Sequence, residues 1–274
     1  MSLPVKRIYI DSTFRTPDSQ SSSSFKFQLA RNIRLPKNTV FFVDDVCIPN
    51  TWLTIETDVN DVLYIVYGGV ELRVKIAQGQ YTASALGTAI NAAFSSNATV
   101  MGKLTCTTNT AYSSLTISTT GDTFILPTDD DLKSRRFFAT NPDTVYNDFQ
   151  NCNDVINNTS GPSPVYSTTK PFSSGFLTLT HSCLYITSPN IGTYTTLGAR
   201  GESDIIKKVP ITSMYGYLVV DSFSSNHDFL NCSDQTLNML EFQIKDVGGK
   251  VVNLHGYNVT FTIVFAQHNE DGLR

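Results

Sequence analysis

Histidines and a short acidic run are the residues of this 274-residue chain whose types best suit chemistry, but their spacing does not favour a site. No HxH or HExxH pair would bring two imidazoles to one metal ion. No GxSxG elbow marks a serine nucleophile, and no GxxxxGKS/T or GxGxxG loop marks a nucleotide site. We therefore expect no catalytic, cofactor-binding or metal-binding residue, although a triad assembled only by folding would leave no such motif. The histidines are His181, His227, His255 and His268.

The run Asp129 to Asp131 is the best set of ligands for a hard cation, because Ca²⁺ and Mg²⁺ prefer carboxylate oxygens. Consecutive side chains point in different directions, however, and no DxDxDG loop follows. The stretch DDDLKSRRFF (129–138) has acids at its start and arginines near its end, as a short helix prefers. We predict the start of a helix here rather than a metal site.

The cysteines are odd in number, widely scattered and without a CxxC pair, so neither a disulfide framework nor a zinc site is indicated. Synthesis in a reducing compartment fits this usage. The five are Cys47, Cys106, Cys152, Cys183 and Cys232.

Composition favours strands and broad contact surfaces. Charged residues make up 16% of the chain, below the roughly 25% of an average soluble domain, so large surfaces are expected to be covered by something other than water. The 17 Phe and 12 Tyr suit a pleated, half-buried surface. The net charge of −4 argues against a general affinity for nucleic acid. No apolar run approaches the roughly 18 residues of a transmembrane helix, and the first residues lack the apolar core of a signal peptide.

Alternating or short apolar runs predict an all-β sandwich at both ends of the chain. Before it, RIYIDSTFRT (7–16) looks like an arm, and PDSQSSSS (17–24) is a linker by composition. The domain boundaries on this basis are 1–60 for the arm and first sandwich strands and 175–274 for the remaining strands. The predicted strands lie at 25–30, 39–49, 51–56, 176–181, 183–188, 204–211, 215–221, 237–246 and 258–265.

Residues 61–138 predict a compact α+β insertion. The stretch 61–76 is a hairpin with Gly68 and Gly69 at its turn, where glycine adopts positive φ at little cost. A helix is expected over 81–94, with Thr82 as its cap. The following 139–174 is rich in Asn, Asp, Pro, Ser and Thr and predicts an extended loop.

Four residues are candidate assembly contacts. Arg7 and Arg15 belong to a modest N-terminal basic cluster that could meet acidic surfaces or a genome, although ordinary salt bridges are the simpler account. Tyr9 lies in the arm, which would tie a subunit to its neighbours. Trp52, the only tryptophan, is either a core anchor or an anchor at a protein interface.

Several stretches of the sequence, taken in this order, carry a resemblance to a known family. They are IYIDSTFRT, SSFKFQLARNIRLPKNTVFFVDDVCIPNTWLTIE, GQYTASALGTAI, SGFLTLTHSCLYITSPNIGTYTTLGARGESDIIKKVPI, MYGYLVVD and LEFQIKDVGGKVVNLHGYNVTFTIVF. Together they resemble the penton (minor capsid) proteins of virophages and polinton-like viruses over most of the chain, with 139–174 the least similar part.

The resemblance implies a single jelly-roll β-sandwich with 61–138 as its insertion, and five copies around the fivefold axis of an icosahedral virion. It implies a double-jelly-roll major capsid protein as partner, and it adds no cofactor. A vertex fibre or host receptor is a further partner on this reading.

Two alternatives remain. One is a receptor- or glycan-binding jelly roll at a vertex or fibre, with 61–138 or 139–174 as its recognition surface. The other is a β-sandwich hydrolase, which a clustered His, Ser and carboxylate in a deep pocket would support.

Overall fold

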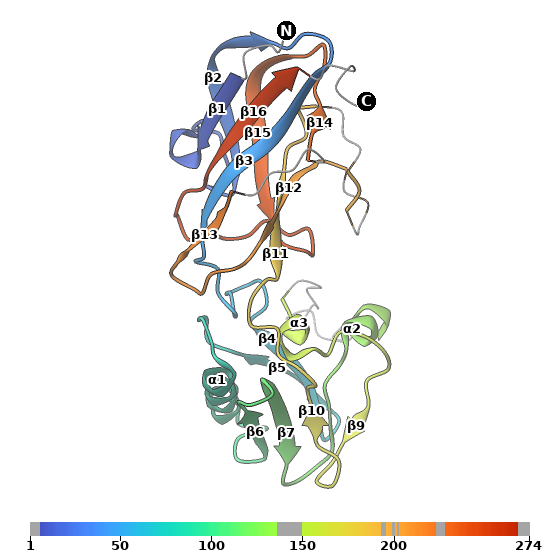
Figure 1. Cartoon of the computed structure of the whole chain (residues 1–274). Coiled ribbons are helices and arrows are strands. Elements are labelled where there is room, and N and C mark those ends of the chain that lie inside the picture. Colours follow the sequence, from blue (N-terminus) through green and yellow to red (C-terminus); the bar gives the residue numbers. More distant parts are fainter. Residues whose placement is uncertain are drawn as a thin grey trace. The chain divides into compact units, whose positions relative to one another are not determined.

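The computed structural model divides the chain into two compact units, and it describes residues 6–135, 150–192, 196–198, 201, 203–222 and 228–267. The first unit consists of Met1–Trp52 and His181–Arg274, and the second of Leu53–Thr180. The second unit is thus inserted into the sequence of the first (Figure 1).

The first unit is a sandwich of two antiparallel sheets (Figure 1). Its strands are β1 (Lys6–Asp11), β2 (Ser24–Arg34), β3 (Thr39–Pro49), β11 (Cys183–Thr187), β12 (Ile205–Pro210), β13 (Leu218–Asp221), β15 (Thr236–Lys245) and β16 (Thr260–Gln267), with a short β14 (Leu230–Asn231) beside β3. One sheet has the order β1-β16-β3-β13 and the other β12-β11-β15-β2. With the eight main strands numbered in sequence, the orders are 1-8-3-6 and 5-4-7-2, which is the connectivity of a single jelly roll. The predicted fold class is confirmed.

The core of the jelly roll follows from side-chain alternation. In β3, Phe41 and Val43 point into the core, and after two acids Val46 and Ile48 do so again. The register against β16 shifts at this point, because the two acids of β3 oppose one residue of its partner, as in a β-bulge. The bulge restores the inward phase, so both halves of the long strand contribute to one core.

Two N-terminal stretches differ from what their composition suggests. RIYID, which looks like part of an arm, is edge strand β1 and pairs with β16 along its length. The Ser-rich stretch is not a loose linker, because Ser23 and Ser24 are buried and their backbone N–H groups donate to Ser21 Oγ at 3.2 and 3.0 Å. Serine hydroxyls satisfy the backbone of this tight loop, which composition alone does not reveal. A 3-10 turn, η1 (Ser12–Phe14), follows β1.

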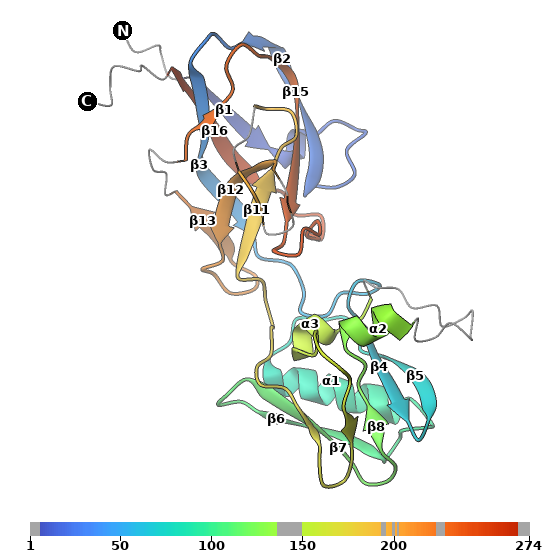
Figure 2. The same cartoon turned by 90° about the vertical axis from the view of Figure 1, so that its right-hand side faces the viewer.

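The second unit is α+β (Figure 2). Its elements are β4 (Val62–Tyr67), β5 (Val70–Lys75), α1 (Ala83–Ser95), β6 (Leu104–Asn109), β7 (Ser114–Thr119), β8 (Phe124–Ile125), α2 (Asp129–Arg135), α3 (Asn153–Ile156), β9 (Val165–Tyr166) and β10 (Phe172–Ser173). The strands form two sheets, β5-β4-β8-β9 and β10-β7-β6. No helix within the described ranges is long and apolar enough to cross a membrane.

Local signals predict the β4–β5 hairpin and helices α1 and α2 of this unit. Gly68 and Gly69 have φ of 54° and 81°, so the β4–β5 turn is of the type that requires positive φ at both positions. Thr82 Oγ1 accepts a hydrogen bond from Ala85 N at 3.2 Å and caps α1 as predicted. Helix α2 begins at Asp129, with three acids in its first turn.

The bounds of the second unit are wider than 61–138 at both ends. The segments 51–56 and 176–181, where strands are expected, form no strand. They carry the chain between the units, and Ile55 and Leu177 are buried in the core of the second unit. Ile55 forms an isolated antiparallel bridge with Gly79 and is not part of a strand. Thr54 Oγ1 donates to Leu179 O at 2.9 Å and joins the two segments. Of the predicted loop 139–174, residues 139–149 lie outside the described residues, whereas 150–174 contain α3, β9 and β10.

Candidate functional site

The cysteine thiols are poorly placed for reaction. All five are free, and four are buried. Burial raises the pKa of Cys106, Cys152 and Cys232 to about 12, so these groups stay protonated near neutral pH. Because the thiolate is the nucleophile, they are inert.

The described histidines make structural contacts. The His181 ring lies against Trp52, with ring centroids 5.9 Å apart. Burial lowers the pKa of His181, and the nearby charge of Asp246 opposes this shift. His255 Nδ1 lies 2.8 Å from Thr51 O. His227 and His268 lie outside the described residues. Within the described ranges, no group of three or more His, Cys, Asp or Glu residues is placed to hold a metal ion.

The acidic run 129–131 fastens a helix to the chain beside it. In order along the run, its carboxylates accept hydrogen bonds from Asn153 Nδ2 at 2.9 Å, Gly161 N at 3.2 Å and Ser163 Oγ at 2.9 Å. The three acids thus diverge to three partners instead of converging on one point. This geometry fits the predicted helix start and gives no cation site.

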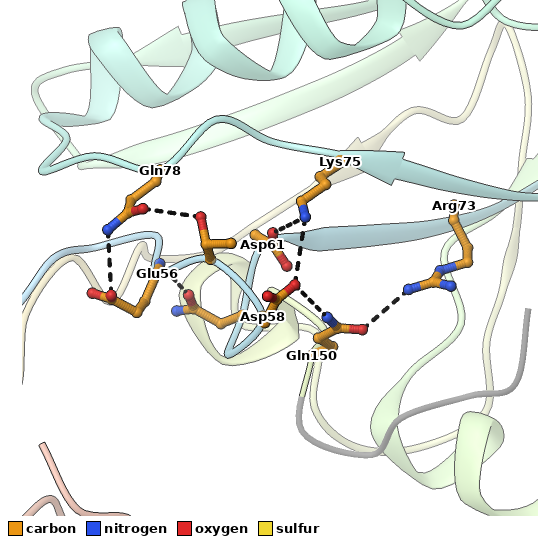
Figure 3. Close-up of polar contacts among 9 residues, drawn as sticks. Glu56, Asp58, Asp61, Arg73, Lys75, Gln78 and Gln150 are labelled. Carbon is orange, nitrogen blue, oxygen red and sulfur yellow. Dashed lines mark hydrogen bonds and ion pairs between the residues drawn. The ribbon is translucent and has the colours of Figure 1, made fainter. Parts of the chain in front are cut away.

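A polar cluster in the second unit includes the fully buried Asp61 (Figure 3). Lys75 Nζ lies 3.0 Å from Asp61 Oδ2 and 3.5 Å from Asp58 Oδ1. Gln150 donates to Asp58 at 3.1 Å and accepts from Arg73 at 3.0 Å. The hydrogen bond to Asp61 raises the pKa of Lys75, which keeps the amine protonated and not nucleophilic. The cluster therefore joins the β4–β5 hairpin to Gln150 and stabilises the fold of the unit.

Three of the four candidate assembly contacts lie on or beside edge strand β1. Arg7 and Tyr9 are exposed, and Arg7 Nη2 is 4.0 Å from Asp44 Oδ2. Arg15 follows η1, and its Nη1 donates to Ser12 O at 2.9 Å. The structure adds the exposed Phe14 to this edge. Sequence reasoning missed that ring, because nothing distinguishes it from a core aromatic residue.

Trp52 lies elsewhere. It is 4% exposed and belongs to the jelly-roll core, where it contacts His181. The core-anchor interpretation describes this position. A contact between its indole and a neighbouring subunit would require the surrounding residues to move.

The most distinctive surface is one that sequence reasoning did not single out. Five apolar or aromatic side chains between residues 214 and 220 are 44–77% exposed, whereas Val219 among them is fully buried. We call them the 214–220 strip: Met214, Tyr215, Tyr217, Leu218 and Val220. The strip runs into β13, whose one strand neighbour among the described residues is β3. MYGYLVVD predicts a strand, but no local signal shows that it lies at an edge.

Comparison with known proteins gives one structural neighbour to report. No family model and no curated protein sequence matches the chain. The crystal structure of the selenomethionine-labelled mavirus penton protein is similar at a TM-score of 0.47 and 12% identity, over 95% of this chain and 99% of that one. A likeness of this strength decides neither family nor fold, so the jelly-roll assignment depends on the strand order given above.

Proposed function

We propose that this chain is a non-enzymatic capsid protein that forms homopentamers at the vertices of an icosahedral virion. The observation that carries the proposal is a jelly roll whose sheet edge exposes a run of uncharged apolar side chains, the 214–220 strip. Soluble monomers rarely expose contiguous apolar patches beyond a few hundred Å², and larger ones mark interaction sites. The resemblance of the sequence to penton proteins supplies the kind of assembly.

The geometry is compatible with a ring. A closed ring needs a heterologous interface, in which one face of each subunit meets a different face of the next. The sheet β1-β16-β3-β13 has two different edges, one basic and aromatic and the other apolar. The low charge of the whole chain suits such contacts, because interface cores are depleted of charge and enriched in Tyr, Met and Arg.

The polar groups discussed above support a mechanical role. The acids 129–131, Asp61 and His181 each have a partner within the fold, and the buried thiols stay protonated. On this proposal the partners are sister copies and a double-jelly-roll major capsid protein, with a vertex fibre or host receptor beyond them. Nucleic acid is not a specific partner.

Native mass spectrometry of the purified 30.2 kDa chain, with negative-stain microscopy, tests the proposal. We expect rings of five with a mass of five times 30.2 kDa, about 151 kDa. Because apolar contacts are little screened by salt, the rings should persist in 1 M NaCl (Debye length about 3 Å), where exposed ion pairs weaken. A chain that stays monomeric at every concentration would refute the proposal.

A second candidate function is recognition of a glycan or receptor by the second unit. Exposed Tyr112 and Phe176 lie on neighbouring segments, since Leu177 N donates to Ser113 O at 2.8 Å. Exposed aromatic rings beside polar groups are typical of ligand-binding surfaces. Saturable binding of one defined glycan, lost in Tyr112→Ser and retained when the protein is monomeric, would favour this function.

A further inference from the structure

The two edges of the sheet β1-β16-β3-β13 differ in chemistry, and this difference identifies a partner for the exposed strip. We propose that the 214–220 strip at the β13 edge binds the β1 edge of a neighbouring copy, around Arg7, Tyr9 and Arg15. The inference rests on the proposed homopentamer and deepens it by assigning both halves of its interface.

Backbone geometry comes first. In the described part of the chain, β1 has β16 as its strand neighbour and β13 has β3, so each strand has one side without a strand partner. The open side of an edge strand presents N–H and C=O groups that can pair with another chain. Because the two open sides are at opposite ends of one sheet, contact between unlike edges joins successive copies head to tail.

Charge supports the pairing of unlike edges. From Lys6 to Arg34, the chain at and after β1 carries six Lys or Arg and two Asp. From Val209 to Ile244 it carries no Lys or Arg and four acids. Strand β12, which precedes the strip, does contain Lys207 and Lys208, and Lys207 pairs with Asp221. The strip itself is therefore an uncharged surface in a stretch without basic residues. A contact between the β1 edges of two copies would instead bring their Lys and Arg side chains together.

The side chains also match. Arginine guanidinium groups stack on tyrosine rings, so Arg7 and Arg15 are suited to Tyr215 and Tyr217 of the strip. Near the end of β13, Val46 pairs with Asp221, and the preceding Asp45 is exposed. The Asp45 carboxylate lies at the border of the strip, where it can pair with an arginine of the β1 edge of the neighbouring copy.

A strip-to-strip contact is the competing arrangement. It would be isologous, with the same patch on both subunits, and would give dimers. It would leave the aromatic and basic β1 edge uncovered in each copy. A ring of five requires a heterologous contact, which a strip-to-strip pairing does not supply and a pairing of unlike edges does.

The test uses one variant of each edge in the full-length chain. The strip variant carries Tyr217→Ser, Leu218→Thr and Val220→Thr, in which threonine keeps the preference for a strand. The β1-edge variant carries Arg7→Gln and Tyr9→Ser. All five side chains are exposed, so the fold of each subunit should be unchanged, and circular dichroism with Trp52 fluorescence verifies this.

A matched control is Val247→Ser. Val247 is an exposed apolar residue in the turn after β15, outside both edges. Wild type and control should form pentamers with equal affinity. Each edge variant should lose at least about 30-fold in association, the effect of removing one interface hot spot.

Mixing the two edge variants gives the sharpest outcome. The strip variant retains an intact β1 edge and the β1-edge variant an intact strip, so a 1:1 mixture has one functional contact and should stop at heterodimers. Rings formed by the strip variant, by the β1-edge variant alone, or by the mixture would each overturn the inference while the pentamer stands. Monomeric wild type and control would refute the pentamer and the inference together.

Discussion

Asp221→Asn is the perturbation whose effect can best be worked out from the structure. Lys207 on β12 and Asp221 on β13 form an ion pair between the two sheets, with Nζ 3.5 Å from Oδ2 and side chains that are only 8% and 14% exposed. Asparagine keeps the shape of the side chain but removes the charge that compensates the buried ammonium. Breaking a buried pair in this way costs about 3–5 kcal/mol of unfolding free energy. This is a large fraction of the stability of an ordinary domain.

The assay is urea unfolding followed by Trp52 fluorescence at one fixed protein concentration. Trp52 is the only tryptophan and lies in the jelly-roll core, so its signal reports the unit that contains the ion pair. A fixed concentration matters because self-association would add to the apparent stability. The double variant Lys207→Met/Asp221→Leu should recover most of the loss, since well-packed apolar residues replace a buried pair at little cost.

The matched control is Asp18→Asn. Lys26 Nζ lies 2.8 Å from Asp18 Oδ2, a shorter contact than that of the buried pair, but 62% of the Asp18 side chain is exposed. Exposed pairs contribute little, because water solvates both charges when they separate. We therefore expect a clearly smaller loss despite the shorter distance. Equal losses for the two variants would show that burial does not set the magnitude, and the reasoning would fail.

Two further predictions concern His181 and the turn after β15. Burial lowers the pKa of His181 below 6.5, so the unfolded chain binds more protons than the folded one at acidic pH. The jelly roll should therefore lose stability as the pH falls through 6.5 toward the lower pKa of the folded state. In thermal unfolding measured between pH 5 and 8, His181→Gln should make this pH dependence weaker. Gly249 has φ of 78° and its N–H donates to Asp246 O at 3.0 Å, so Gly249→Val should cost about 1–3 kcal/mol in urea unfolding, whereas an unchanged midpoint would contradict this turn assignment.

Elements determined by neighbouring residues could be predicted from the sequence. The β4–β5 hairpin follows from two glycines between alternating apolar residues, and α1 follows from Thr82 and the spacing of Leu86, Ile90 and Phe94. Helix α2 follows from acids at its start. In each case the signal lies within a few residues of the structure that it specifies.

Features that depend on distant residues could not be predicted in this way. The segments 51–56 and 176–181 have strand-like composition, but burial in the core of the second unit replaces a ladder there. The run 215–221 has the composition of a core strand, and only the strand order shows that β13 is an edge with exposed side chains. Charge and position in the sequence make Arg7, Tyr9 and Arg15 candidate contacts, and this stays a prediction, whereas no signal in the sequence singles out the strip at the other edge of the sheet.

The contact between Trp52 and His181 has a consequence for how this molecule can change. These residues are the last and first of the jelly roll on either side of the insertion, and their rings are 5.9 Å apart. The two ends of the jelly-roll chain at the insertion point thus lie so close together that a few residues would connect them. The entropic cost of closing a loop grows only with the logarithm of its length. The stability of the jelly roll therefore depends little on the length of the chain between these two residues. The second unit can therefore be lengthened, shortened or exchanged in evolution while the jelly roll stays the same.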